Sequence, residues 1–200
     1  MSRSKIIEDI KIAGEQVCKG FILDDKSEEY YIDLVAYFLG LQRKYNPKKG
    51  LLICGTVGTG KTVSMQVMAK LFRNFQIINT RYIIRDYFAA KPPTSIIDKY
   101  GRYSFKQNTA GIHQMDKPIT YCFDDFGLEN VNVKNFGNEQ NIMEEIILDR
   151  YDEFRKKGMI TLATTNLTAQ MIEETYGGRV RDRLREMMNY VELTGESKRK

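Results

Sequence analysis

The most informative chemistry in the sequence is a glycine-rich segment at residues 55–62, which reads GTVGTGKT. It matches the pattern G-x-x-x-x-G-K-[ST] through Gly55, Gly60, Lys61 and Thr62. Glycines permit positive φ, so successive backbone N–H groups can point into one concavity that holds phosphate oxygens. In such a loop Lys61 reaches the β- and γ-phosphates, and the Thr62 hydroxyl completes the coordination of Mg²⁺. The segment predicts a site for a nucleoside triphosphate.

A chance match in a glycine-rich turn is the alternative interpretation of this segment. An apolar strand at residues 51–54 precedes it and an amphipathic helix at residues 61–72 follows it, which is the context that a phosphate-binding loop requires. The helix presents its positive dipole end to the phosphates. The residues expected to bind the nucleotide are Gly55, Val57, Gly58, Thr59, Gly60, Lys61, Thr62 and Val63.

Two adjacent carboxylates, Asp124 and Asp125, follow the apolar strand at residues 119–123. Ligands of open α/β sheets bind at the carboxyl ends of the strands. We therefore expect Asp124 to hold Mg²⁺ through water and Asp125 to orient or deprotonate an attacking water molecule. A pair of solvated turn aspartates is the alternative.

Polar residues after the strand at residues 159–164 complete the candidate site. Asn166 can donate its amide to the γ-phosphate or hold the catalytic water; its alternative role is to cap the helix that starts near Thr168. Arg179 and Arg183 are four residues apart and share one helix face. An arginine presented to a neighbouring subunit's γ-phosphate stabilises transition-state charge. A solvated basic face, or one that binds nucleic acid, remains an alternative.

The segment between residues 81 and 106 contains six basic residues and only two acidic ones, interleaved with aromatic residues. Bases stack on aromatic rings while Lys and Arg follow the backbone, at about 1–3 kcal/mol per stacked base. Alternatively, several of these aromatic side chains fill the core. Residues expected to contact single-stranded DNA are Arg81, Arg85, Lys91, Tyr100, Arg102, Tyr103 and Lys106.

These segments lie within an alternation of strand-like and helical periodicities, which favours a mostly parallel sheet covered on both faces. The expected helices cover residues 5–19, 27–41, 61–72, 82–89, 95–100, 141–157, 168–176 and 179–187. The expected strands cover residues 51–54, 75–79, 119–123, 159–164 and 189–193. Ser27 is the expected N-cap of the second helix, and a long loop is expected before residue 141.

Length and composition bound the class of protein. The 200 residues suffice for one mid-sized domain with a core, and 42% hydrophobic and 28% charged residues exclude disordered, collagen-like and disulfide-scaffold classes. The charged N-terminus does not resemble a signal peptide, and no stretch approaches the roughly 18–20 apolar residues that span a bilayer. Cys18, Cys54 and Cys122 form no C-x-x-C pair, and two of them are expected to be buried in strands. We expect a cytoplasmic protein that has no membrane contact.

The order of these parts resembles the AAA+ ATPases of the bacterial replicative helicase loader (DnaC-type) family, and the related IstB-type transposition ATPases share the features. The resemblance covers about residues 48–195 and rests on GTVGTGKT, YCFDDFG, EEIILDRYDEFRKKG, TLATTNL and YGGRVRDRLREM. The first of these is generic, whereas TTNL, the RY pair within EEIILDRYDEFRKKG and the segment YG-x-R-V-x-D-R-L are much more specific.

This resemblance implies a P-loop NTPase with an AAA+ core, whose five-stranded parallel sheet is flanked by helices, and no C-terminal lid domain. It implies three parts: a short helical N-terminal arm at 1–47, the ATPase core at 48–195 and a basic tail at 196–200. The arm is shorter than the helicase-binding domain of familiar loaders.

The resemblance also assigns roles to individual residues. Lys61 and Thr62 match the Walker A lysine and hydroxyl, and Asp124 matches the Walker B metal carboxylate. Asn166 matches sensor 1, and Arg183 matches the arginine finger.

The resemblance also bears on two further positions, Arg179 and Asp125. Arg179 precedes the arginine-finger position by one turn and is its neighbour on the helix. Asp125 stands where family members usually carry Glu, and its reach is shorter by one methylene.

The expected function is that of a homo-oligomeric ATPase of DNA replication, which uses ATP and Mg²⁺ to load or remodel a replicative helicase on single-stranded DNA. Its hydrolysis is expected to be slow and stimulated by DNA or by the partner. The motifs equally permit an IstB-type transposition ATPase. Less favoured alternatives are a P-loop small-molecule kinase and a non-hydrolysing ATP switch.

Overall fold

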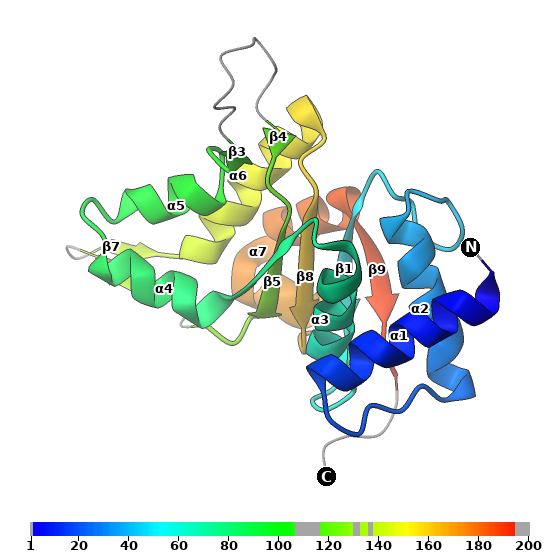
Figure 1. Ribbon diagram of the computed structural model, residues 1–200. Coiled ribbons are helices and arrows are strands. Elements are labelled where there is room, and N and C mark those ends of the chain that lie inside the picture. Colours follow the sequence, from blue (N-terminus) through cyan, green and yellow to red (C-terminus); the bar gives the residue numbers. More distant parts are fainter. Residues whose placement is uncertain (1, 107–116, 130–132, 136–137, 195–200) are drawn as a thin grey trace.

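The structure is a computed structural model that describes residues 2–106, 117–129, 133–135 and 138–194. Its centre is a sheet of five parallel strands in the order β2-β5-β8-β1-β9. The strands are β1 (Gly50–Cys54), β2 (Gln76–Asn79), β5 (Tyr121–Phe126), β8 (Thr161–Thr165) and β9 (Met188–Glu192). The predicted α/β fold with a five-stranded parallel sheet is confirmed (Figure 1).

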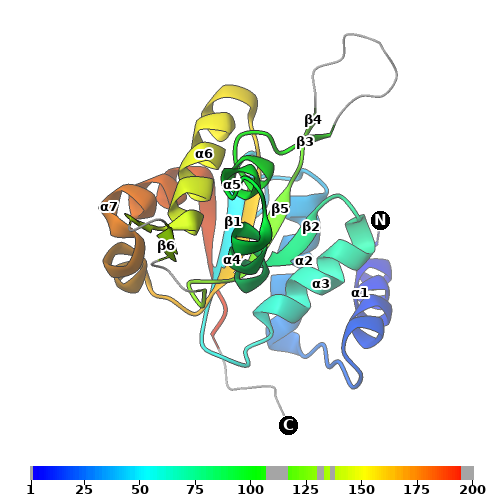
Figure 2. The ribbon, with the colours of Figure 1, turned by 90° about the vertical axis from the view of Figure 1, so that its left-hand side faces the viewer.

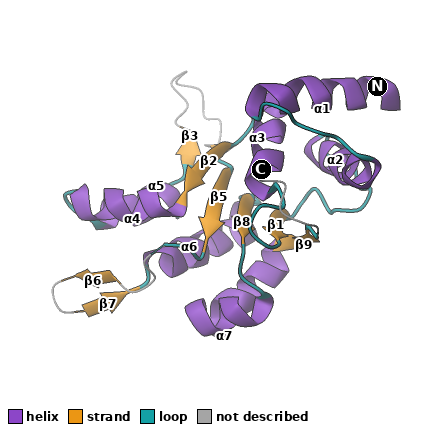
Figure 3. Cartoon of the chain, turned by 90° about the horizontal axis from the view of Figure 1, so that it is seen from below, coloured by secondary structure: helices purple, strands orange, loops and turns teal. Residues whose placement is uncertain are grey.

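Helices cover both faces of this sheet. Seen from below, α1, α2 and α3 lie on one side, α6 and α7 on the other, and α4 and α5 lie beyond β2 (Figure 3). Figure 2 views the molecule from the side of α4 and α5. The helices are α1 (Arg3–Val17), α2 (Asp25–Phe38), α3 (Lys61–Phe72), α4 (Thr80–Ala89), α5 (Thr94–Tyr100), α6 (Ile142–Lys157) and α7 (Ala169–Met187).

The inner strand β1 shows how the sheet separates two cores. Leu51 and Ile53 belong to the core under α1, α2 and α3, whereas Leu52 and Cys54 belong to the core under α4 to α7. This alternation follows from the two-residue period of a strand. Because both faces are covered, every residue of β1 and β8 is buried, as is usual for parallel sheets.

The first two helices share the core on the α3 side. Ile10 of α1 and Leu34 of α2 are fully buried in the same cluster as Met65 of α3. Residues 1–47 thus contribute directly to this core. The boundary at residue 47 stays a prediction, and the predicted tail at 196–200 lies outside the described residues.

Most predicted elements match within a few residues, but the N-cap of the second helix was predicted wrongly. Asp24 is the N-cap of α2, and its side chain accepts a hydrogen bond from the Ser27 backbone N–H. The Ser27 hydroxyl in turn accepts one from the Asp24 N–H over 3.0 Å. Ser27 is therefore the third helical residue of a capping box, in which a hydroxyl can serve as well as the usual Glu or Gln.

One other segment differs from expectation. The predicted long loop before residue 141 contains a short hairpin of β6 (Val133–Asn135) and β7 (Asn138–Gln140). The two predicted helices at 168–176 and 179–187 correspond to the two halves of α7, which meet at a sharp bend at the non-helical residue Gly177, where φ is 82° and ψ is 161°. The short strands β3 (Phe105–Lys106) and β4 (Lys117–Pro118) form a second two-stranded sheet.

The buried arginine of the RY pair, Arg150, joins the sheet to α5. The Arg150 side chain is fully buried on α6, and its guanidinium donates hydrogen bonds to the Thr161 hydroxyl and to the carbonyls of Tyr100, Ile119 and Ile160. Burial lowers the pKa of Arg150 to about 9, which leaves it charged at neutral pH. Its hydrogen bonds compensate the lost hydration.

Among the described residues, no helix is both long enough and apolar enough to cross a membrane.

Candidate functional site

The phosphate-binding loop lies between the end of β1 and the start of α3, and two of its glycines are required by the geometry. Gly60 caps α3 in the left-handed conformation, with φ of 94°, which a side chain rarely adopts. At Gly55 a Cβ atom would lie 2.3 Å from the carbonyl oxygen of Leu193. A side chain would therefore strain the backbone at Gly60, and Gly55 leaves no room for one.

Lys61 is the link between this loop and β8. Its side chain is buried, and Nζ donates hydrogen bonds to the carbonyl oxygens of Gly55 over 2.7 Å and of Thr56 over 2.8 Å. It also donates to Asn166 Oδ1 over 2.6 Å. The structure thus brings together Lys61 and Asn166, two of the predicted site residues, which follow the paired strands β1 and β8.

Thr62 and Asp124 form the second pair that the sequence predicted. The Thr62 hydroxyl donates to Asp124 Oδ1 over 2.8 Å. The buried Thr164 hydroxyl donates to the same oxygen over 2.7 Å. The sequence did not predict a role for Thr164, although its position near the end of the central strand β8 was the available signal.

These oxygens fit a nucleotide-bound Mg²⁺ ion. Mg²⁺ prefers oxygen ligands and is often held by one or two protein groups, with the substrate phosphates and water completing the shell. Thr62 and Asp124 supply one hydroxyl and one carboxylate beside the phosphate-binding loop. Within the described residues no group of three or more His, Cys, Asp or Glu side chains could hold a metal by itself.

Asp125 has an unusual backbone, with φ of 59°. Asn79, the last residue of β2, donates from Nδ2 to Asp125 Oδ2 over 3.2 Å. The Thr80 hydroxyl donates to the Asp125 carbonyl, and the Asp125 N–H donates to the Thr164 hydroxyl. Sequence reasoning missed Asn79 and Thr80 because β2 carries no motif; the signal was their position at a strand end.

The predicted arginines lie on the second half of α7. The guanidinium of Arg183 lies 4.5 Å from the centre of the Tyr151 ring on α6 and donates to the Tyr151 hydroxyl over 3.4 Å. The side chain of Arg179 is exposed. In the described part of the chain, neither arginine is hydrogen-bonded to the phosphate-binding loop. Their proposed action on a neighbouring subunit stays a prediction.

The basic and aromatic residues between 81 and 106 are only partly available on the surface. The side chains of Arg81, Tyr82, Arg85 and Phe88 are exposed on α4, and the Arg85 guanidinium lies 4.8 Å from the Tyr82 ring centre. We call these four residues the α4 stripe. Lys91 is exposed as well.

The prediction that Tyr100 contacts DNA was wrong. Its side chain is 4% exposed and packs edge-on against Tyr121, with the ring centres 5.2 Å apart, because α5 turns this face to the core. Arg102 is exposed but forms an ion pair with Asp149 at 3.0 Å, and Tyr103 is exposed. The side chain of Lys106 lies outside what the structure describes.

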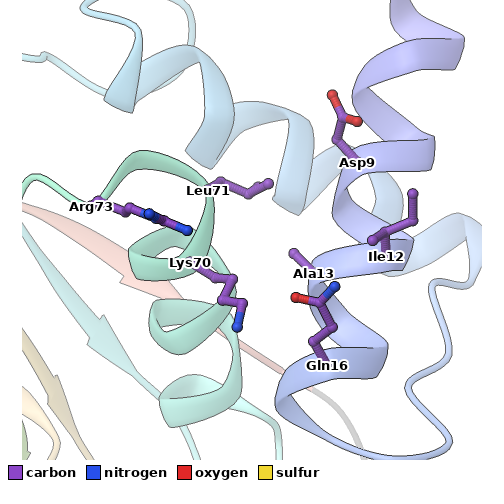
Figure 4. Close-up of a pocket in the computed structure, with 7 residues that line it drawn as sticks. All are labelled: Asp9, Ile12, Ala13, Gln16, Lys70, Leu71 and Arg73. Atoms are coloured by element: carbon purple, nitrogen blue, oxygen red, sulfur yellow. The ribbon is translucent and has the colours of Figure 1, made fainter.

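A small groove of about 200 Å³ lies elsewhere, between α1 and the end of α3 (Figure 4). Its lining residues are Asp9, Ile12, Ala13, Gln16, Lys70, Leu71 and Arg73. None of them is a predicted site residue.

No protein-family model and no curated protein matches the chain. Solved structures do resemble it. DnaI matches with a TM-score of 0.60 and 17% identity, over 92% of this chain and 93% of that one. The DnaC helicase loader matches with a TM-score of 0.55 and 14% identity, over 88% of this chain and 95% of that one.

The replication initiator DnaA, bound to AMPPCP and single-stranded DNA, matches with a TM-score of 0.58 and 15% identity. That match covers 89% of this chain and 49% of the DnaA chain. At such identities a likeness shows the fold alone, and this chain shares the fold of DnaI, the DnaC helicase loader and DnaA.

Proposed function

We propose that this chain binds and hydrolyses ATP, and that it loads or remodels a replicative helicase on single-stranded DNA. The observation that carries the proposal is the bonded cluster at the ends of β1, β5 and β8. There Lys61 is held by Asn166, and Thr62 is held by Asp124. The likeness to a helicase loader, and to an initiator whose structure holds an ATP analogue and single-stranded DNA, supports the wider role.

Each residue of the site has a separate role in the proposed hydrolysis of ATP. Lys61, whose ammonium already binds three oxygen atoms, exchanges the loop carbonyls for β- and γ-phosphate oxygens. Thr62 and Asp124 hold Mg²⁺, which neutralises charge that develops on the phosphates. Asp125 orients the attacking water and accepts its proton, and Asn166 fixes the γ-phosphate or that water.

Hydrolysis also requires positive charge at the γ-phosphate, and we assign it to a neighbouring subunit. Arg183 and Arg179 lie on α7 without a hydrogen bond to their own phosphate-binding loop in the described residues, which suits a role in trans. An arginine of this kind typically accelerates phosphoryl transfer by about 10³- to 10⁵-fold. The protein is therefore proposed to act as a homo-oligomer.

The α4 stripe is the proposed surface for single-stranded DNA. Two guanidinium groups suit the phosphates, and the exposed rings of Tyr82 and Phe88 suit base stacking. Tyr103 and Lys91 extend the same chemistry beyond α4.

ATP turnover is the direct test, measured without DNA, with single-stranded DNA and with duplex DNA. We expect turnover that single-stranded DNA stimulates and that Lys61→Ala abolishes. Lys70→Ala is the matched control, because Lys70 is an exposed lysine in the last turn of the same helix. Turnover that survives Lys61→Ala, or phosphorylation of a nucleoside or nucleotide, would contradict the proposal.

The partner is tested by affinity capture on the immobilised protein with ATP. Retention of a replicative helicase supports the loader role. Retention of a transposase instead would reassign the chain to transposition.

A further inference from the structure

A buried polar contact joins the segment after the strand-end carboxylates to the first half of α7. The ring of Phe126 stacks on Tyr176, with centres 4.5 Å apart and planes 11° apart. The Tyr176 hydroxyl donates a hydrogen bond to Glu129 Oε1. The exposed fractions of Tyr176 and Glu129 are only 3% and 6%. We call this pair the Glu129–Tyr176 clasp.

Hydrogen bonds connect the Glu129–Tyr176 clasp to the strand ends that carry Asp125 and Asn166, the proposed catalytic residues. The Gly127 N–H donates to Glu129 Oε2 over 2.9 Å, two residues after Asp125. The Thr165 hydroxyl donates to the Phe126 carbonyl over 2.6 Å, one residue before Asn166. Residues adjacent to Asp125 and Asn166 are thus connected to Glu129 and Tyr176.

The segment after β5 packs tightly against the segment after β8. A Cβ atom at Gly127, whose φ is 98°, would lie 2.3 Å from a methyl carbon of Leu167. The Leu167 N–H donates to the Thr165 hydroxyl over 3.0 Å, which fixes the turn that contains Asn166. The segment after β5 and the segment after β8 are therefore in direct contact beside the clasp.

Burying the Glu129 carboxylate costs free energy because the group loses its hydration. An apolar residue of similar volume would pack there without that loss. Burial, reinforced by the neighbouring Glu129, raises the pKa of Tyr176 well above its ordinary value, so the phenol remains a donor. The pair gives a directional bond that apolar packing lacks.

The direction of the Tyr176 hydrogen bond matters because of where this residue lies on α7. The next residue is Gly177, at which α7 bends, with φ of 82° and ψ of 161°. Arg179 and Arg183 lie just beyond the bend on the second half of the helix. An anchor immediately before a bend sets the orientation of the segment after it.

We propose that Glu129 and Tyr176 are positioning residues: they hold the arginine-bearing half of α7 at a fixed orientation to Asp125 and Asn166, and so set how well a subunit's arginines serve its neighbour's ATP. This inference rests on the proposed function, in particular on arginines that act in trans. Neither residue is assigned a contact with nucleotide in this proposal.

Three variants separate positioning from folding. Tyr176→Phe keeps the ring stacked on Phe126 and removes only the hydroxyl. The double variant Tyr176→Phe with Glu129→Gln also removes the buried negative charge, and the Gln amide oxygen still accepts from the Gly127 N–H, so it lacks only the bond to residue 176. Glu129→Gln can still bridge Tyr176 and the Gly127 N–H, because an amide both donates and accepts.

Tyr37→Phe is the matched control, since the buried Tyr37 hydroxyl donates to the Lys49 carbonyl over 2.8 Å, apart from the proposed catalytic residues. We expect Tyr176→Phe and the double variant to lower kcat by about 10- to 100-fold, as misplacement of catalytic groups does. The Kd for ATP should stay within about twofold, because Lys61, Thr62 and Asp124 are unchanged. Glu129→Gln should restore most of kcat, and Tyr37→Phe should leave it unchanged.

Mixed oligomers test the assignment to the arginines. Lys61→Ala subunits lack a working nucleotide site but carry the arginines, and Arg183→Ala subunits are the reverse, so mixing them should restore turnover. Tyr176→Phe placed in the Lys61→Ala subunit should abolish that restoration. The same change placed in the Arg183→Ala subunit should leave most of it.

The outcomes distinguish the two proposals. Equal loss in both placements, or wild-type turnover with Tyr176→Phe and with the double variant, overturns the positioning role alone. No restored turnover on mixing overturns action in trans and this inference with it. No turnover by the unsubstituted oligomer with DNA present overturns the proposed function itself.

Discussion

The side-chain amide of Asn79 donates a hydrogen bond to Asp125 Oδ2 over 3.2 Å, across the ends of two paired strands. Asp125 adopts φ of 59°, a left-handed conformation that Asp and Asn tolerate better than most residues. Its backbone is held by Thr80 and Thr164. The positive φ therefore favours Asp at position 125, in addition to the proposed catalytic role of its carboxylate.

Asp125→Asn isolates the charge of this carboxylate. Asn accepts the same backbone conformation but cannot take a proton from water, so we expect intact ATP binding and thermal stability with turnover lower by about 10²- to 10⁴-fold. Steady-state turnover and titration with a fluorescent ATP analogue measure the two effects. Asp152→Asn, at an exposed position on α6, is the control. Undiminished turnover in Asp125→Asn would exclude the carboxylate as the base.

Asp125→Glu tests the reach of the carboxylate. Glu tolerates positive φ less well than Asp, so we expect the free energy of unfolding in urea to fall by about 1 kcal/mol. Its turnover decides the switch alternative: a higher rate with Glu shows that the short carboxylate limits hydrolysis. Brisk and equal rates for Asp and Glu count against an ATP switch that does not hydrolyse.

Thr164→Val replaces a buried hydroxyl with a methyl group of similar size. The change removes a donor to Asp124 and leaves the Asp125 N–H without its acceptor, which should lower the free energy of unfolding by about 1–3 kcal/mol. We also expect a weaker Mg²⁺-dependent gain in ATP affinity, measured by titration with and without Mg²⁺. Thr164→Ser, which keeps the hydroxyl, should retain that gain; if Thr164→Val retains it equally, the hydroxyl does not orient Asp124.

The α4 stripe predicts two separable effects on DNA binding. Tyr82→Ala should weaken binding of single-stranded DNA by about 1–3 kcal/mol through lost stacking, with little change in salt dependence. Arg85→Ala should weaken binding and reduce the slope of log K against log salt by about 1. Fluorescence anisotropy with a labelled oligonucleotide measures both. Arg155→Ala, an exposed arginine paired with Glu186, is the control; an equal loss there would indicate only a general charge effect.

The three cysteines should differ in reactivity. Cys18 is exposed, whereas Cys54 and Cys122 are buried, and burial raises the pKa of the Cys54 thiol to about 11. Burial also raises the pKa of Cys122. Because the thiolate is the reactive form, iodoacetamide at pH 8 should modify one cysteine in the folded protein and three in denaturant. Rapid modification of Cys54 in the folded state, seen by peptide mass mapping, would contradict the burial.

Some features could be predicted from sequence because their causes are local. The glycine pattern and apolar spacing predicted the helix at residues 61–72, and α3 has the same bounds. Asp124 and Asn166 were expected near the phosphate-binding loop because carboxyl ends of parallel strands meet at one edge of a sheet. Their bonds to Thr62 and Lys61 agree with that expectation.

Other features depended on residues distant in the chain, and only the tertiary structure decided them. Tyr100 and Tyr103 have the same chemistry in sequence, but α5 turns the first into the core and leaves the second in solvent. Glu129 and Tyr176 are 47 positions apart, and nothing in either local pattern indicates that they meet. Local periodicity and spacing therefore determine which elements form and which strand ends carry chemistry, whereas packing determines which side chains are exposed and which distant pairs bond.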